Sequence, residues 1–410
     1  MTSSSDQPGP RRPADVYAEF GDRLSGPAEP GLTEPDAAEA GEVTEAETEA
    51  EPAQVLAPAA QAGVPAQSAP AAASAPAAEP PAAEPIVTGA FTPYRIGDAG
   101  RAFDRTVPLP STAPGGMHDY AMDAATISDP DGTPRLILRG ASGRGLAHQQ
   151  YGDPRQDDFG YALSADGEHV VGVVADGVSA GAWSHLAARL AAEEGSRAVA
   201  NLLATTPAVD IDWHGLFVML SERMHDLCAT LPSRDSCDVG LTAREVAEKM
   251  ATTIIVGVVA VRPSPEGTHA VTVVRLGDTS GWIVDEVDGW VALGEVKNQG
   301  AVIAESSTAC LPLVPDADPL IVETTLADGA ALLLLTDGVG DPLGSGKGDV
   351  GKALAKQWAA PPHPIEFAGQ ICFGRKTFDD DRAALGIWPV PGAASAAATT
   401  SSAAATAATA

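Results

Sequence analysis

The stretch Arg155–Gly181, RQDDFGYALSADGEHVVGVVADGVSAG, decides the fold of this 410-residue chain. Two runs rich in β-branched and aromatic residues, FGYALS and HVVGVVAD, flank the turn-forming sequence Ala165-Asp166-Gly167. Such a pattern predicts a β-hairpin. The second run stops abruptly at Asp176-Gly177. Asp-Gly is common turn chemistry, but a carboxylate placed directly after a buried strand can also bind a cation.

The same ending occurs elsewhere in the chain. Leu332–Leu335 lead into Asp337-Gly338, and VTVVRLGD ends at Gly277-Asp278. Asp157 precedes the first hairpin strand, and an Asp379–Asp381 run precedes RAALGIW. Carboxylates that converge repel one another unless a cation lies among them, and Mg²⁺ and Mn²⁺ prefer oxygen ligands. The set predicts a divalent metal site, although each Asp-Gly alone is typical of a turn.

The rest of the sequence predicts a layered α+β domain. Helical spacing begins at Trp183, a second helix covers about 213–231, and Thr242 with Glu245 forms a capping box that opens a third. A β-rich block follows from about 252 to 335, then helices over about 349–358 and 364–373, and a last strand, RAALGIWPV. Helices and strands that come in blocks, and do not alternate, favour antiparallel sheets.

Composition limits the class of protein. The four cysteines are widely spaced without a CxxC pair, which favours neither a disulfide framework nor a zinc site. There is no secretory apolar segment and no run of membrane-spanning length, so we expect a cytoplasmic protein. The formal net charge is −30. This acidity argues against nucleic acid or an anionic membrane as the partner.

Three regions differ in composition. Residues 1–115 form an acidic arm rich in Ala and Pro, and fifteen acidic residues against three Arg in its first ninety give a charge of −12 there. We expect this arm to be disordered, because it has too few apolar residues to offset its ordering entropy. Residues 116–391 are expected to fold as one domain, and 392–410 form a low-complexity tail of Ala, Thr and Ser.

The order of the motifs resembles that of the type 2C metal-dependent protein phosphatases (PPM family), in particular a bacterial subgroup. The resemblance covers about residues 136–390 and rests on RQDDFGYAL, VVADGVSAGAWSHLAA, ATTIIVGVV, VVRLGDTSGWIVD, LLLLTDGVGD and DDDRAALGIW. It implies a four-layer α/β/β/α sandwich of two antiparallel sheets flanked by helices. It also implies hydrolysis of phosphoserine and phosphothreonine in proteins by a water that bridges two Mn²⁺ or Mg²⁺ ions, with an opposing Ser/Thr kinase as a pathway partner.

The resemblance also implies the metal ligands. Asp176 matches the aspartate that bridges the two metals, and the carbonyl of Gly177 matches a ligand of the second. Asp337 matches the aspartate on the first metal. In the last motif Asp380 fits best by its spacing to RAALGIW, with Asp381 as the alternative.

Two further aspartates match functional positions of the family. Asp157 matches the acidic residue that holds metal-bound water, and Asp278 matches the aspartate of a third, weaker metal in bacterial members. The arginine with which many members grip the phosphate falls at Gly152 here. His148 is the expected substitute, with Arg155 as the alternative.

Two other functions remain open from the sequence. A catalytically weak family member could act as a phosphoprotein-binding or regulatory module, which the missing arginine favours. A calcium-binding protein of the EF-hand type is disfavoured, because the chain lacks a D-x-D-x-D-G loop.

Overall fold

The computed structural model of the protein describes residues 96–98, 118–231, 240–286, 289–294 and 309–390. The predicted arm and tail lie outside these residues, apart from Ile96–Asp98. The backbone N–H of Ile96 donates to the carbonyl of Gly374 at 3.1 Å, and the Arg375 guanidinium donates to the carbonyl of Ile96 at 3.1 Å. This part of the predicted arm therefore contacts the loop that precedes the Asp379–Asp381 run.

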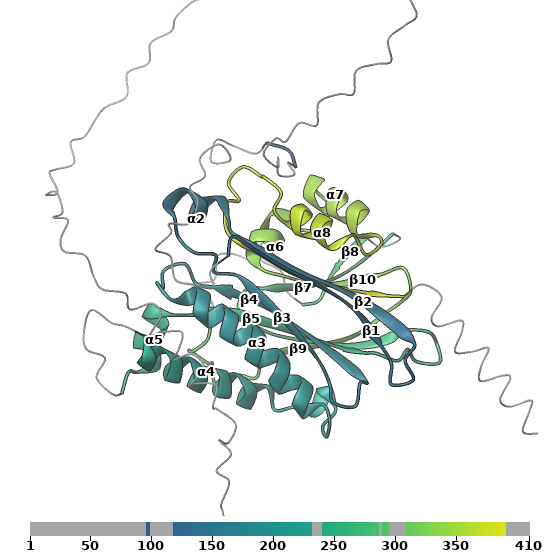
Figure 1. The fold of residues 1–410 in the computed structure, drawn as a ribbon, viewed down its shortest axis with the longest axis horizontal. Coiled ribbons are helices and arrows are strands. Elements are labelled where there is room, and N and C mark those ends of the chain that lie inside the picture. The colour runs from purple at the N-terminus through teal and green to yellow at the C-terminus, as the bar shows by residue number, and fades with distance from the viewer. Residues whose placement is uncertain (1–95, 99–117, 232–239, 287–288, 295–308, 391–410) are drawn as a thin grey trace, which may run out of the picture. The chain divides into compact units, whose positions relative to one another are not determined.

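Two antiparallel sheets form the centre of the described chain (Figure 1). The first has the strand order β1-β2-β11-β10-β7-β8, with bounds Tyr120–Ser128, Pro134–Gly143, Arg382–Pro389, Ala331–Leu335, Ser280–Asp285 and Gly289–Ala292. The second has the order β3-β4-β5-β6-β9, with bounds Asp158–Leu163, His169–Gly177, Thr252–Ala260, His269–Leu276 and Leu320–Leu326. The predicted hairpin is confirmed as the pair β3 and β4.

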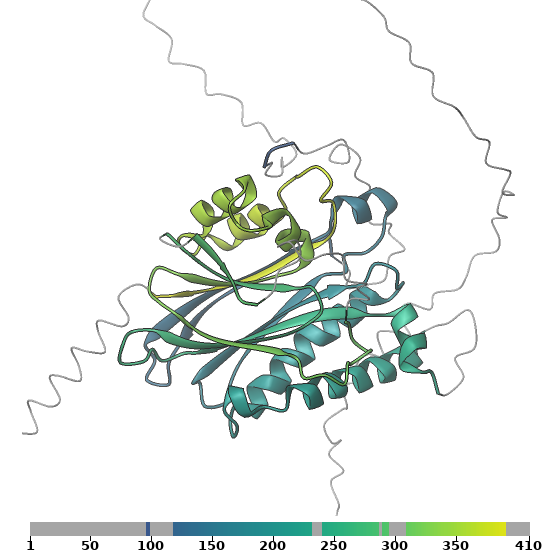
Figure 2. The same cartoon turned by 180° about the vertical axis from the view of Figure 1, so that it is seen from behind.

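Helices cover the outer face of each sheet, as Figures 1 and 2 show from opposite sides. The second sheet is covered by α3 (Ser184–Leu202), α4 (Trp213–Thr230) and α5 (Ala243–Lys249). The first is covered by α6 (Asp337–Leu343), α7 (Asp349–Trp358) and α8 (Pro364–Ile371). A short helix, α2 (Leu146–Tyr151), and a 3₁₀ turn, Ala208–Asp210, complete the described elements. The four-layer α/β/β/α sandwich implied by the sequence is confirmed.

The apolar core explains why the central strands are continuous apolar runs. Along β5, Ile254 and Val256 pack under the helices of the second sheet, whereas Ile255 and Val259 lie between the two sheets. Both faces of β5 are covered, so its sequence shows no polar alternation. The predicted capping box of α5 is present, since Thr242 and Glu245 exchange hydrogen bonds at the first turn.

Four of the described elements were not predicted from the sequence: β1, α2, the 3₁₀ turn Ala208–Asp210 and α6. β1 is an edge strand with mostly exposed side chains, so it has no apolar run to reveal it. Cys310 and Cys372 are free thiols, and Cys237 lies outside the described residues. In the described part of the chain, no helix combines the length and the apolar character that crossing a bilayer requires.

Candidate metal centre

The predicted carboxylates come together where strands of the two sheets end. Asp176 is near the end of β4 in the second sheet, and Asp337 begins α6 directly after β10 of the first. The backbone N–H of Asp337 lies 3.5 Å from the Oδ2 of Asp176. Burial raises the pKa of Asp176 well above its ordinary value, and the carboxylates of Asp157 and Asp337 raise it further. Antiparallel sheets packed face to face have thus placed acidic residues from distant motifs side by side.

Asp157 lies within the same cluster. It is 3 % exposed, and burial, followed by the charge of Asp381, raises the pKa of its carboxyl well above the ordinary value. Asp278, which follows β6, contributes to the raised pKa of Asp176 but less than Asp157 does. Asp278 also raises the pKa of Cys310, which is first raised by burial. Asp278 therefore lies near enough to both Asp176 and Cys310 to influence their charge.

Asp381 is held by the loop around α2. Its Oδ1 accepts a hydrogen bond from the backbone N–H of Gly145 at 2.5 Å, and its Oδ2 accepts one from the backbone N–H of Gln156. The Nδ1 of His148 lies 2.8 Å from the same Oδ2. Asp381 is 1 % exposed, and both of its oxygens have protein partners. Its carboxylate thus joins the α2 loop to the start of β11.

Asp380 has a different environment, although it is the adjacent residue. Asp380 is exposed to solvent, and its Oδ1 accepts a hydrogen bond from the backbone N–H of Asp381 at 2.8 Å. Enough chain surrounds the carboxyl that desolvation raises its pKa. Asp380 is thus the more accessible of the two candidates from the last motif.

Two glycines permit this close approach of separate segments. A Cβ at Gly338 would lie 1.8 Å from the carbonyl oxygen of Asp381, and one at Gly145 would lie 2.1 Å from the carbonyl carbon of Asp380. Neither contact is possible for a larger residue without displacing backbone. The glycine that follows Asp337 therefore does more than form a turn, because it lets α6 lie against the backbone of Asp381, directly before β11.

The two residues considered for gripping phosphate both have structural contacts. His148 is 8 % exposed and contacts Asp381 as described. The guanidinium of Arg155 donates to the Oγ of Ser142 at 2.6 Å and to the carbonyl of His118 at 3.2 Å, and it lies 3.4 Å from Asp158. These contacts hold the segment that leads into Asp157.

Thr336 is a site residue that the sequence analysis did not identify. Its Oγ1 accepts a hydrogen bond from the backbone N–H of Ala383 at 2.8 Å, which joins the ends of β10 and β11. A hydrogen bond from the same side chain to Asp157 lowers the pKa of that carboxyl, against the larger effect of burial. The signal that could have found it is its position directly before Asp337-Gly338.

The family is decided by a match of residues 144–362, just over half of the chain, to the model for protein phosphatase 2C. The chain belongs to the protein phosphatase 2C family. Members of this family, also called PPM-type phosphatases, are protein-serine/threonine phosphatases that use Mn²⁺ or Mg²⁺. The family predicted from the motifs is thereby confirmed. No curated protein sequence matches the chain closely enough to be counted as a relative.

Several solved phosphatases are similar to this one in structure. A serine/threonine phosphatase from S. agalactiae is 12 % identical, with 66 % of this chain and 99 % of that chain covered and a TM-score of 0.43. The phosphatase MsPP from Mycobacterium smegmatis, in complex with cacodylate, is 17 % identical, with 66 % and 98 % covered and a TM-score of 0.34. The PstP catalytic domain with two manganese ions is 15 % identical, with 62 % and 99 % covered and a TM-score of 0.40. The family assignment itself stands on the sequence match.

The residues of this phosphatase fit a hard divalent cation. Eleven buried side-chain atoms have no hydrogen-bond partner within the described residues, and four of them belong to Asp157 itself or to neighbours of the cluster residues in sequence or register: Gln156 Oε1, Asp157 Oδ2, Thr253 Oγ1 and Thr279 Oγ1. Thr253 is the register partner of Asp176, so the two side chains share a face of the second sheet. Among the described residues, no three Asp, Glu, His or Cys side chains are grouped closely enough to hold a metal ion by themselves. Mg²⁺ keeps several waters and takes few carboxylates, so an open acidic cluster with unsatisfied oxygens suits it.

Proposed function

We propose that this protein hydrolyses phosphoserine and phosphothreonine in proteins with two divalent cations, Mn²⁺ or Mg²⁺, at the carboxylate cluster. Asp176, the carbonyl of Gly177, Asp337 and Asp380 would hold the two ions, and Asp278 would hold a third, weaker one. When bound, such ions lower the pKa of a bridging water and neutralise charge on the phosphoryl oxygens. The observation that carries the proposal is the convergence of carboxylates from distant motifs: the backbone N–H of Asp337 lies 3.5 Å from Asp176 Oδ2, and burial together with neighbouring carboxylates raises the pKa values of Asp157 and Asp176.

The chain's own residues would position the reaction. Asp157 Oδ2 is buried and has no partner in the described part of the chain, while the Thr336 side chain lowers the pKa of this carboxyl against the larger effect of burial. This oxygen is the acceptor that would hold a proton of the attacking water. The contacts of Asp381 with the α2 loop support Asp380, and not Asp381, as the ligand of the last motif, because both oxygens of Asp381 already have partners.

The direct test is hydrolysis of p-nitrophenyl phosphate and of a phosphothreonine peptide, with Mn²⁺, with Mg²⁺ and with a chelator. Asp176→Ala is the control, since it removes the proposed bridging ligand. We expect metal-dependent turnover by the natural chain and none above background by the variant. Isothermal titration calorimetry of the metal-free protein with Mn²⁺ gives an independent readout of the site. Equal turnover by both proteins would contradict the proposal.

A second candidate function is a phosphoprotein-binding or regulatory module with little catalysis. One observation favours this candidate. Of the two residues expected to grip phosphate, His148 contacts Asp381 and Arg155 donates to Ser142, so both side chains already have protein partners. Retained binding of a phosphopeptide without hydrolysis of either substrate would support this candidate. An opposing Ser/Thr kinase is proposed as the source of the substrate in either case.

We also propose that residues 116–391 are the catalytic domain and that the acidic arm takes no part in the chemistry. Deletion of residues 1–90 should leave turnover of p-nitrophenyl phosphate within about twofold. Loss of that turnover would show that the arm contributes to catalysis.

A further inference from the structure

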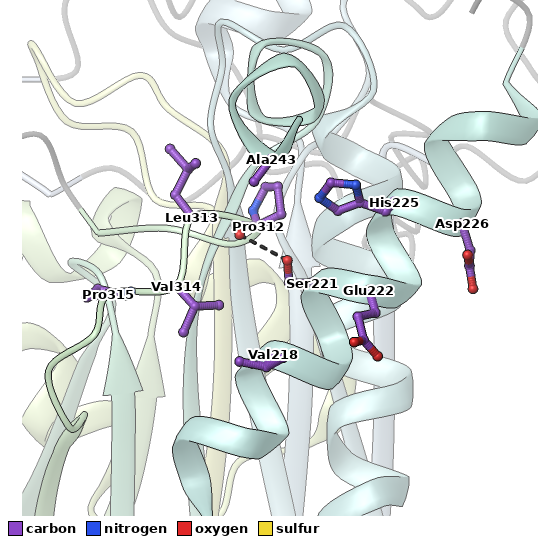
Figure 3. Close-up of a pocket in the computed structure, with 10 residues that line it drawn as sticks. All are labelled: Val218, Ser221, Glu222, His225, Asp226, Ala243, Pro312, Leu313, Val314 and Pro315. Carbon is purple, nitrogen blue, oxygen red and sulfur yellow. Dashed lines mark hydrogen bonds between the residues drawn. The ribbon is translucent and has the colours of Figure 1, made fainter. Parts of the chain in front are cut away.

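An open groove lies beside α4, and none of the proposed metal ligands lines it. It has a volume of about 820 Å³ and lies between α4, from Val218 to Asp226, and the segment Pro312–Pro315 (Figure 3). Its volume falls in the range of roughly 300–1,000 Å³ that is usual for ligand-binding clefts. We call it the α4 groove. Nothing in the proposed chemistry uses it.

The α4 groove has aliphatic side chains that remain in contact with solvent. Leu313 is 40 % exposed and Val218 is 37 % exposed, and Val314 is partly buried and packs against the core below the helices of the second sheet. Figure 3 places Val218 on the helix side and Leu313 and Val314 on the segment side. Aliphatic surface of this kind, in a concave site, favours binding of an aliphatic side chain from a partner.

The rim of the groove is acidic. Glu222 and Asp226 are exposed on α4, and Asp316 and Asp318 are exposed directly after Pro315. The cations that adjoin the groove in sequence are Arg223 and Arg244. Arg223 already lies 3.9 Å from Asp226. The excess of negative charge therefore favours a partner that carries Lys or Arg next to its aliphatic residue.

A short hydrogen-bonded path connects the groove to the carboxylates. The Oγ of Ser221 donates to the carbonyl of Pro312 at 2.9 Å. The adjacent Leu311 exchanges two backbone hydrogen bonds with Thr252, at 3.1 and 2.8 Å. The Oγ1 of Thr252 donates to the carbonyl of Asp176 at 2.8 Å. The segment that borders the groove therefore also pairs with the start of β5, whose Thr252 contacts the backbone of Asp176.

We propose that the α4 groove binds the part of a phosphoprotein substrate that flanks the phosphorylated residue, with a preference for a flank that contains Lys or Arg beside an aliphatic residue. This inference rests on the proposed function and names the substrate class of that same site. The aliphatic side chain would lie against Val218 and Leu313, and the cation would lie near Glu222 and Asp226.

The test compares three substrates with the full-length protein and Mn²⁺: a phosphothreonine peptide with an Arg-Leu flank, the same peptide with Glu-Ser in place of Arg-Leu, and p-nitrophenyl phosphate. We expect kcat/KM to be about tenfold higher for the Arg-Leu peptide, a difference that would appear mainly in KM. The double variant Glu222→Lys with Asp226→Lys should abolish the preference and leave p-nitrophenyl phosphate turnover within about twofold. Glu366→Lys, an exposed position on α8, is the matched control and should retain the preference.

Fluorescence anisotropy of the labelled, unphosphorylated Arg-Leu peptide tests the groove independently of catalysis. If neither peptide nor p-nitrophenyl phosphate is hydrolysed but the peptide binds and the double variant does not, only the proposed function fails. If all three substrates are hydrolysed and the two peptides have equal KM, only the groove inference fails. A change in sedimentation of the double variant, without a change in peptide kinetics, would assign the groove to a second copy of the chain and overturn the inference.

Discussion

The Nδ1 of His148 lies 2.8 Å from the Oδ2 of Asp381, although 233 residues separate them in the sequence. This contact joins α2 to the beginning of β11, next to the proposed ligand Asp380. Partners that orient a metal ligand or its neighbour commonly change metal affinity by about 10–100-fold when they are removed. The contact therefore predicts a role for His148 in positioning the site.

His148→Ala should weaken Mn²⁺ binding by about tenfold or more, because Asp381 loses a side-chain partner and the α2 loop loses its connection to β11. Calorimetric titration of the metal-free protein measures this. His148→Asn keeps an N–H donor near the position of Nδ1 and should recover much of the affinity. Equal Mn²⁺ affinity in all three proteins would contradict the positioning role and leave the histidine as a packing residue.

Asp176→Asn should lower metal-dependent turnover by roughly 100-fold or more, since it removes the proposed bridging carboxylate. The same change should stabilise the metal-free protein by roughly 0.5–2 kcal/mol, because a buried carboxyl whose pKa is raised well above normal is costly to ionise at neutral pH. Urea unfolding at pH 7.5 in a chelator measures the stability. Reduced activity together with reduced stability would indicate a damaged fold and count against this explanation.

His185 predicts a loss of stability in mild acid. Burial, followed by the charge of Arg155, lowers its pKa to about 4, and neither ring nitrogen has a hydrogen-bond partner among the described residues. The unfolded chain therefore binds a proton that the folded chain does not, between a pKa near 6.5 and about 4. The contribution of His185 to the free energy of unfolding is at its full value above pH 6.5. As the pH falls through this window, the free energy of unfolding falls by up to about 3 kcal/mol. His185→Gln removes this contribution. The free energy of unfolding of the variant, measured with urea, should therefore fall less between pH 6.5 and pH 4 than that of the natural protein. The buried carboxyls make the opposite contribution, but both proteins share it. It therefore cancels when the variant's curve of unfolding free energy against pH is subtracted from that of the natural protein.

Gly338→Ala should destabilise the protein by roughly 1–3 kcal/mol and weaken Mn²⁺ binding, because the added Cβ would meet the carbonyl of Asp381 and separate Asp337 from Asp380. Gly348→Ala is the matched control. Gly348 lies directly before α7, has a φ of −75°, and a Cβ there would have no atom within 4 Å. Thermal unfolding and Mn²⁺ titration of both variants provide the comparison. An equal effect of the two substitutions would argue against a specific role for the close approach at Gly338.

The amino-acid sequence by itself determined the α+β class, the β3–β4 hairpin, the capping box of α5 and the order of the family motifs. Each of these depends on local patterns: apolar runs, turn residues and short-range hydrogen bonds. Only the tertiary structure showed that both carboxylate oxygens of Asp381, the neighbour of Asp380, have protein partners. It also showed that His148 and Arg155 have structural partners and that α4 borders a groove. These features depend on contacts between segments far apart in the chain. Neither composition nor periodicity indicates which side chain will meet which carboxylate, because packing of the two sheets sets those distances.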